Sequence, residues 1–304
     1  MPVDEWTKAV RLLKLTPPSP IDSPALSADV GVEFGARTRR GPARSVNDDH
    51  HLVLRIGRHL ETLMTSLPDG QLAKNFDEFG YGMVLADGIG SAAELAGRLA
   101  IVALVQLVID FSKWHVRVNE PTADEMMNRA ERYFRSVDSV LRTAGEDHSR
   151  VLQTALTVTY SAGSELFFVH VGHSRAYLFR DDHLMQLTHD HTLDHPRPGK
   201  AAILGMPAGG HDQHHLVTET LGAAGAGPLR IDVERCGLLD RDIVLLCSNG
   251  LTDVVDDALI VEALRSHPTP DDTCRALVEL AADSGATDDV TALVAHYHIS
   301  PPAE

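Results

Sequence analysis

The sequence predicts an α+β fold, in which strands and helices form separate groups along the chain. Short apolar runs typical of strands occupy residues 32–57, 80–88, 156–190, 241–250 and 288–299. Helical patterns cover residues 91–114, 122–145 and 269–285. Because the first two helical patterns follow one another with no strand between them, a βαβ repeat with a parallel sheet is not expected.

The first 29 residues look like a tail attached to a domain at residues 30–299, and residues 300–304 form a second short tail. Residues 5–15 have the pattern of a short amphipathic helix. The proline-rich linker at residues 16–24 cannot pack regularly. Docking of a partner is one role for the tail, but its composition favours a loose segment.

The helix predicted at residues 91–114 contains the most apolar part of the chain. Its charge-free run, residues 99–109, is shorter than the roughly 18 residues that a membrane span needs, so we predict a buried helix in a soluble protein. The next helix is predicted to begin at Thr122 or Asp124. The last helix is predicted to begin at the sequence TPDD, residues 269–272, which is typical of a helix cap.

Composition and charge restrict the function. The chain has 27 basic and 43 acidic residues, a formal net charge of −16, and 43% of its residues are apolar. The apolar content is enough for one large core. Because so acidic a chain is a poor partner for nucleic acid or for an anionic membrane, we predict neither as a partner.

The cysteines and the N-terminus predict a cytoplasmic location. Cys236, Cys247 and Cys274 have no C-x-x-C spacing. An odd and sparse set of cysteines argues against a disulfide framework and fits a reducing compartment. The first 20 residues carry early acids and lack the apolar centre of a signal peptide.

Polar side chains gather where predicted strands end. Four segments share this position: Asn47-Asp48-Asp49, Ala86-Asp87-Gly88, Ser248-Asn249-Gly250 and Thr287-Asp288-Asp289. Mg²⁺ and Mn²⁺ prefer oxygen ligands, often a few carboxylates together with water. For any single segment, a simple turn is the better interpretation, because Asp-Gly and Asn-Gly are turn formers. Four such segments in one chain make a cation site the stronger hypothesis.

Five motifs, taken in order, resemble one known family. They read ARSVNDDHHLV, YGMVLADGIG, FFVHVGHSRAYLFRDDHLMQLTHDHT, DIVLLCSNGLTD and GATDDVTALVAHY. Together they resemble the metal-dependent protein phosphatases (the PPM family, or type 2C serine/threonine phosphatases) of the bacterial type, over residues 31–298. The resemblance implies a four-layer α-β-β-α sandwich of two mainly antiparallel sheets flanked by helices. It also implies two Mn²⁺ or Mg²⁺ ions and a water that they activate to attack phosphorus.

The resemblance also implies a role for individual residues. Asp49 matches a metal ligand of the first motif, and Asp48 stands beside it where the family usually has glutamate. Asp87 matches the aspartate that bridges both ions, and Gly88 matches the neighbouring carbonyl ligand. Asp288 matches the last metal ligand.

Arg44 and two departures from the family pattern complete the implied site. Arg44 matches the arginine that grips the substrate phosphate, a task suited to a bidentate guanidinium. Asn249 and His173 replace two aspartates that in bacterial relatives help to hold a third, weaker ion, which makes that third site doubtful. Asn249 keeps one amide oxygen as a ligand for the two-ion centre but brings no charge. His173 is either a ligand for a softer metal or a loop histidine, and the second interpretation is favoured.

Residues 189–222 match the family's variable flap beside the cleft. The segment is rich in glycine, proline and histidine. A zinc site is the alternative, but the histidines lack regular ligand spacing. A flap that shapes access to the substrate is the favoured interpretation.

The expected function is metal-dependent hydrolysis of phosphoserine and phosphothreonine in proteins, at full or attenuated rate. The alternative is a pseudophosphatase that binds a phosphoprotein or a regulatory protein without turnover. The aspartates at positions 49, 87 and 288, together with Arg44, favour the enzyme, whereas Asn249 and His173 favour the binding module.

Overall fold

The computed structural model describes residues 29–68, 74–111, 115–147, 150–192, 217–223 and 228–300. The predicted N-terminal helix, the proline-rich linker and residues 301–304 lie outside these ranges. Of the predicted flap, only residues 189–192 and 217–222 are described. The predicted role of residues 193–216 as a flap therefore lies outside the described residues and stays a prediction.

The described chain builds two five-stranded antiparallel sheets. The first, here called the β10 sheet, has the strand order β1 (Asp29–Arg39), β10 (Val290–Ser300), β9 (Ile243–Cys247), β6 (Arg175–Arg180) and β7 (His183–Gln186). The second, the β3 sheet, has the order β2 (Asp49–Glu61), β3 (Asn75–Ile89), β4 (Gln153–Ala162), β5 (Glu165–Val171) and β8 (Asp232–Gly237). Each sheet combines segments that are far apart in the sequence.

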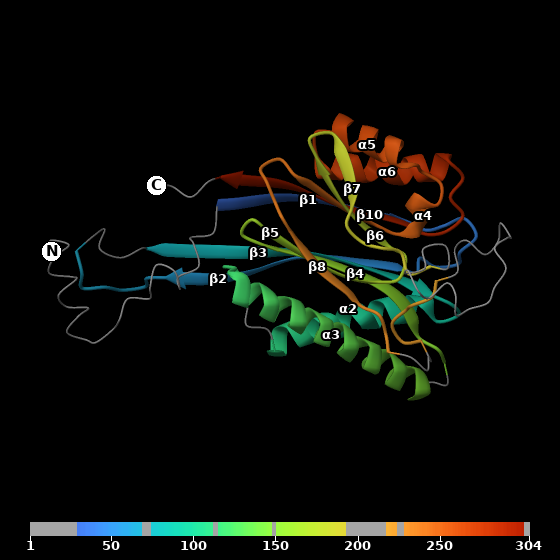
Figure 1. Ribbon diagram of the computed structural model, residues 1–304, viewed down its shortest axis with the longest axis horizontal. Coiled ribbons are helices and arrows are strands. Elements are labelled where there is room, and N and C mark those ends of the chain that lie inside the picture. Colours follow the sequence, from blue (N-terminus) through green and yellow to red (C-terminus); the bar gives the residue numbers. More distant parts are fainter. Residues whose placement is uncertain are drawn as a thin grey trace.

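Two pairs of helices cover the outer faces of the two sheets (Figure 1). Helices α2 (Ala93–Phe111) and α3 (Glu120–Asp147) pack on the β3 sheet. Helices α5 (Asp257–Ser266) and α6 (Pro270–Asp283) pack on the β10 sheet, and a single turn, α4 (Asn249–Thr252), follows β9. The predicted four-layer α-β-β-α sandwich is confirmed.

Alternation along the strands explains why the layers form. In β3, Met83 and Leu85 pack between the two sheets, whereas Val84 and Ala86 pack against α2 and α3. Successive side chains of a strand point to opposite faces, so a strand that is apolar on both faces needs a layer on each side. The sandwich supplies both layers.

The helix predictions are confirmed in part. Helix α6 begins as expected, since the Thr269 side chain accepts a hydrogen bond from the Asp272 backbone N–H. The predicted start of α3 is wrong, because Asn119 caps the helix: its side-chain oxygen accepts a hydrogen bond from the Thr122 N–H at 2.9 Å. Asparagine serves this purpose as well as threonine or aspartate does.

The prediction that the apolar helix is buried is wrong for one face of α2. The buried stripe of α2 consists of small residues and Leu104, whereas Val102, Ile109 and Phe111 are exposed. Small residues allow α2 to lie close to the β3 sheet, so only a narrow stripe is covered. In the part of the chain that the structure describes, no helix is long and apolar enough to cross a membrane.

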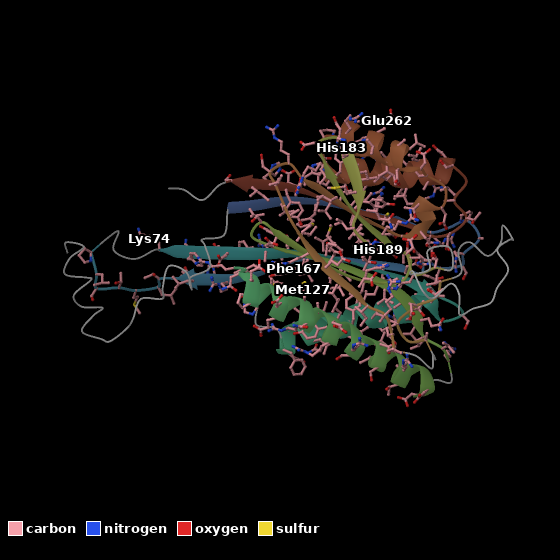
Figure 2. All side chains as sticks on the ribbon, in the orientation of Figure 1. Lys74, Met127, Phe167, His183, His189 and Glu262 are labelled. Atoms are coloured by element: carbon pink, nitrogen blue, oxygen red, sulfur yellow. The ribbon has the colours of Figure 1, made fainter. Side chains whose placement is uncertain are left out.

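An apolar cavity of about 140 Å³ lies between α2, α3 and the β3 sheet. Met127 of α3 and Phe167 of β5, both labelled in Figure 2, line it. The cavity lies on the outer face of the β3 sheet and is lined by none of the predicted site residues.

Candidate metal centre

Two carboxylates, one buried and one largely buried, lie opposite one another where β2 begins and β3 ends. Asp49 and Asp87 are direct cross-strand partners in the antiparallel register. One oxygen of Asp49, Oδ2, accepts hydrogen bonds of 2.7 Å from the Ser248 and Thr291 hydroxyls. These two residues belong to the β9–α4 junction and to β10, so Asp49 joins the two sheets at this edge.

Each of these two aspartates also has one oxygen that accepts no hydrogen bond from the described residues. These oxygens are Asp49 Oδ1 and Asp87 Oδ2, and both are buried. Burial and the charge of Asp87 raise the pKa of Asp49 well above its ordinary value. Burial and the charge of Asp288 raise the pKa of Asp87 to about 8. Buried carboxylate oxygens without donors are costly, and a divalent cation satisfies them, so this pair fits a metal.

Arg44 lies beside two further predicted ligands. Its Nε and Nη2 donate to the two oxygens of Asp288 at 2.8 and 2.9 Å, and its Nη1 donates to Asp48 Oδ2 at 3.3 Å. The structure therefore brings Arg44, Asp48 and Asp288 together. In this arrangement the charge of Asp288 faces the guanidinium.

Asp289 belongs to the predicted segment Thr287-Asp288-Asp289, but the sequence patterns gave it no role of its own. Its two carboxylate oxygens accept hydrogen bonds from the backbone N–H groups of Gly41 and Asp48, at 2.8 and 2.7 Å. The first loop and the last loop of the site are thus tied together by a buried carboxylate. The only sequence signal was the second aspartate of the Asp-Asp pair, and its role depends on contacts more than 240 positions away.

Gly88 has a packing role at the end of β3. A Cβ built on this residue would lie 2.1 Å from the Ala93 carbonyl oxygen, so no side chain fits where α2 begins. The Gly88 N–H also donates to the Asp48 carbonyl at 3.2 Å. The close approach of α2 explains why glycine is required here.

Asn249 opens the short helix α4, directly after β9. Its side-chain nitrogen donates to Asp253 Oδ2 at 3.0 Å. Because the amide nitrogen is used in this way, the amide oxygen is the atom that Asn249 can offer to a cation. Asp253 also contributes to the raised pKa of Asp87, after burial, Asp288 and Asp289, which places its charge near the centre.

His173 lies on the turn between β5 and β6, next to Asp87. Its Nδ1 is 3.8 Å from Asp87 Oδ2, and 12% of its side chain is exposed. The structure therefore brings His173 to the predicted centre.

The candidate ligands do not converge on one metal site in this structure. Within the described ranges, no three or more His, Cys, Asp or Glu side chains converge as a group that could hold a metal ion. The hydrogen bonds explain this result. Asp288 and Asp48 turn toward Arg44, and Asp289 is used by backbone N–H groups, so the fit to a cation rests on Asp49 and Asp87.

Comparisons with known proteins agree with this architecture. No family model matches the chain. It is 34% identical to the serine/threonine protein phosphatase PstP of Mycobacterium tuberculosis over 218 residues, which cover 70% of this chain and 40% of that relative. It is 29% identical to the phosphatase stp of Listeria innocua over 214 residues, 70% of this chain and 82% of the relative. The chain thus spans less than half of PstP.

A solved structure of a serine/threonine phosphatase is also similar to this chain. The catalytic domain of PstP in complex with two manganese ions has a TM-score of 0.64 and 27% identity, covering 88% of this chain and 99% of that one. The two antiparallel five-stranded sheets between helix pairs match the architecture of PPM phosphatases. The chain belongs to the bacterial PPM family of serine/threonine phosphatases.

Proposed function

We propose that the chain hydrolyses phosphoserine and phosphothreonine in proteins by a metal-dependent mechanism. The observation that carries this proposal is the facing pair Asp49 and Asp87, with one buried oxygen on each that accepts no hydrogen bond from the described residues. The relatives are serine/threonine phosphatases, and one of them holds two manganese ions. Both facts support the same chemistry.

Six residues would hold the ions. They are Asp48, Asp49, Asp87, the carbonyl of Gly88, Asn249 and Asp288. Two Mn²⁺ or Mg²⁺ ions supply Lewis acidity and an activated water when they are bound. Asp49 is prepared for this role because Ser248 and Thr291 hold its second oxygen and so fix its orientation.

Arg44 would change its partner from Asp288 to the substrate phosphate when the substrate binds. It pairs with Asp288 through two hydrogen bonds, one to each carboxylate oxygen. A phosphate offers the same fork of two oxygens, so the guanidinium can move from a carboxylate to a substrate without changing its type of contact. Release of Asp288 by Arg44 would then leave that carboxylate for a cation.

A binding module without turnover is the second candidate. The pairing of Arg44 with Asp288 favours it, because a guanidinium held by a carboxylate can stabilise the loops in place of a cation. A phosphorylated protein or a regulatory protein would then be a partner and not a substrate.

The test is Mn²⁺-dependent hydrolysis of a phosphothreonine peptide, together with calorimetry that counts the ions bound per chain. We expect two ions and an activity that a chelator removes. Asp87→Asn should lose both a tight ion and activity, whereas the matched control Asp124→Asn, at an exposed position of α3, should keep both. Tight metal binding with no turnover by the wild-type chain would support the binding module instead.

A further inference from the structure

We propose that His173 is a nitrogen ligand of the cation held by Asp87. This centre would therefore prefer Mn²⁺ and other ions that accept nitrogen over Mg²⁺. The inference rests on the proposed function, because it needs a cation at Asp87. It gives the centre a mixed nitrogen and oxygen donor set.

The distance between the two side chains fits ligands of one ion. His173 Nδ1 and Asp87 Oδ2 are 3.8 Å apart, which is too long for a hydrogen bond. Two donors that are each about 2.1 Å from one ion can lie up to about 4.2 Å apart. The Asp87 oxygen that faces His173 is the one that accepts no hydrogen bond from the described residues. An ion between the two side chains would satisfy that oxygen.

The turn that carries His173 is held on its N-terminal side by two buried histidines. The Gly172 carbonyl accepts hydrogen bonds from the His191 backbone N–H at 2.7 Å and from His170 Nε2 at 3.0 Å. The Gly172 N–H donates to His191 Nδ1 at 3.3 Å. Both backbone groups of the residue before His173 are therefore used.

The partners of His170 also fix its protonation. Burial and the neighbouring His191 lower the pKa of His170 to about 3, so its ring is neutral near pH 7. Its Nε2–H donates to Gly172, while its Nδ1 lies 2.7 Å from the Thr157 hydroxyl and accepts from it. His170 therefore holds the turn as a neutral ring near pH 7.

Steric contact restricts the same turn. Gly172 has a φ of +117°, and a Cβ built on it would lie 2.3 Å from the Ala155 Cβ. Only glycine adopts this backbone next to β4 without strain. Because the turn is ordered by the fold, little further entropy is lost when His173 binds an ion.

Charge and donor type explain the expected metal preference. Histidine at position 173 and asparagine at position 249 remove two negative charges that carboxylates would supply. Mg²⁺ needs hard oxygen donors and binds carboxylates, whereas imidazole suits later transition metals and Mn²⁺ tolerates it. The exchange should therefore weaken Mg²⁺ binding more than Mn²⁺ binding.

The experiment detects nitrogen bound to manganese directly. The full-length chain is loaded with Mn²⁺, and electron spin echo envelope modulation is recorded for the wild type, His173→Ala, His173→Gln and the control His183→Ala. His183 is an exposed histidine of β7 (Figure 2) that pairs with Arg180, at the end of β6 opposite the turn that carries His173. We expect a ¹⁴N signal from directly bound imidazole in the wild type and in His183→Ala. Both substitutions of His173 should abolish this signal.

Calorimetry on the same samples gives a second readout. Mn²⁺ affinity should fall by about tenfold or more in the His173 variants, the size of effect seen for contacts that support a ligand. Mg²⁺ affinity should change less. His173→Gln serves as the test if His173→Ala does not fold, because the two variants remove the same ring.

The possible outcomes separate this inference from the proposed function. Bound Mn²⁺ without a ¹⁴N signal in the wild type, or a signal that persists in both His173 variants, would overturn the inference and leave the phosphatase proposal standing. A wild-type chain that binds no Mn²⁺ would overturn both.

Discussion

Two groups of buried polar side chains lie in this fold, and they differ in how they are satisfied. In β8, Asp232 accepts hydrogen bonds from Arg230 and lies 3.2 Å from Nε2 of His191, a residue of the predicted flap. At the strand ends, Asp49 and Asp87 each keep one buried oxygen that accepts no hydrogen bond from the described residues. Both groups are buried carboxylates, so burial alone does not separate them.

The direction of the pKa shift separates the two groups. Although burial acts against it, hydrogen bonds from His191 and Arg230 hold the pKa of Asp232 below its ordinary value. The pKa of Asp87 rises to about 8, because burial and Asp288 outweigh the attraction of Arg44. A carboxylate with its own cation is a structural element, whereas one surrounded by like charge is suited to an external cation.

The largest expected effect comes from Asp87→Asn. Turnover with Mn²⁺ should fall by more than about 100-fold, since even contacts that merely support a ligand cost 10–100-fold. In chelator, the same variant should be more stable than the wild type, because it removes the cost of burying the Asp87 carboxyl beside Asp288, which the folded wild type meets by ionisation or by uptake of a proton. Steady-state kinetics and thermal melting in chelator measure the two effects. A variant that is less stable without metal would contradict the contrast between the groups.

The pH dependence of stability should follow the same contrast. The pKa of Asp87 is 3.8 in its ordinary state and about 8 in the folded chain. Between these values the folded chain without metal binds more protons than the unfolded chain does. Its free energy of unfolding should therefore fall as the pH rises, by up to about 1.4 kcal/mol per pH unit.

Melting curves from about pH 5 to 8, in chelator and in Mn²⁺, test this expectation. Saturating Mn²⁺ should remove most of the slope, because a bound cation favours the ionised carboxylate. Equal slopes in both series would show that Asp87 does not contact the ion.

Asp232→Asn should instead destabilise the group around Asp232, whose carboxylate already has hydrogen-bond donors. Removing one partner of a buried ion pair typically costs about 3 kcal/mol of folding free energy or more. We expect a lower midpoint in urea, with and without Mn²⁺, and little change in the number of ions bound. The exposed substitution Asp124→Asn is the control for loss of one acidic charge. A changed ion count in Asp232→Asn would mean that this group reaches the metal.

The smallest expected effect belongs to Asn249→Asp. The added carboxylate should tighten Mn²⁺ by about tenfold, or about 1.4 kcal/mol. The gain has a limit, because the substitution replaces the 3.0 Å hydrogen bond from Asn249 to Asp253 by repulsion between two carboxylates. Mn²⁺ titration by calorimetry, with Asn249→Ala as the matched variant, measures the difference. Equal affinity of the wild type and Asn249→Asp would show that the amide is a sufficient ligand.

The sequence predicted the parts of the fold that depend on local pattern. Short apolar runs indicated the strands, and TPDD indicated the start of α6, because both signals lie within a few residues. The exposed face of α2 was missed, since an apolar run does not show how wide the covered stripe is. The cap at Asn119 was missed because several capping residues stand close together in the sequence.

The residues of the candidate site were predicted from the order of the five motifs. The structure brings Arg44, Asp48, Asp49, Asp87 and Asp288 to one edge of the sandwich. Their roles stay predictions, as does the use of Asn249 as a ligand. The support from Ser248, Thr291 and Asp289 depends on contacts between the two ends of the chain, which no local pattern contains.

The bonds from Asp289 to the backbone at Gly41 and Asp48 have a consequence for the order of synthesis. A ribosome completes the first loop of the site long before it reaches residue 289. Among the described strands, β1 pairs only with β10, so the first strand of the sheet has no partner there until the last one is made. Contacts between such distant segments form slowly. During translation, the carboxylates of the first loop are therefore expected to stay exposed to solvent until the final strand closes the sheet over them.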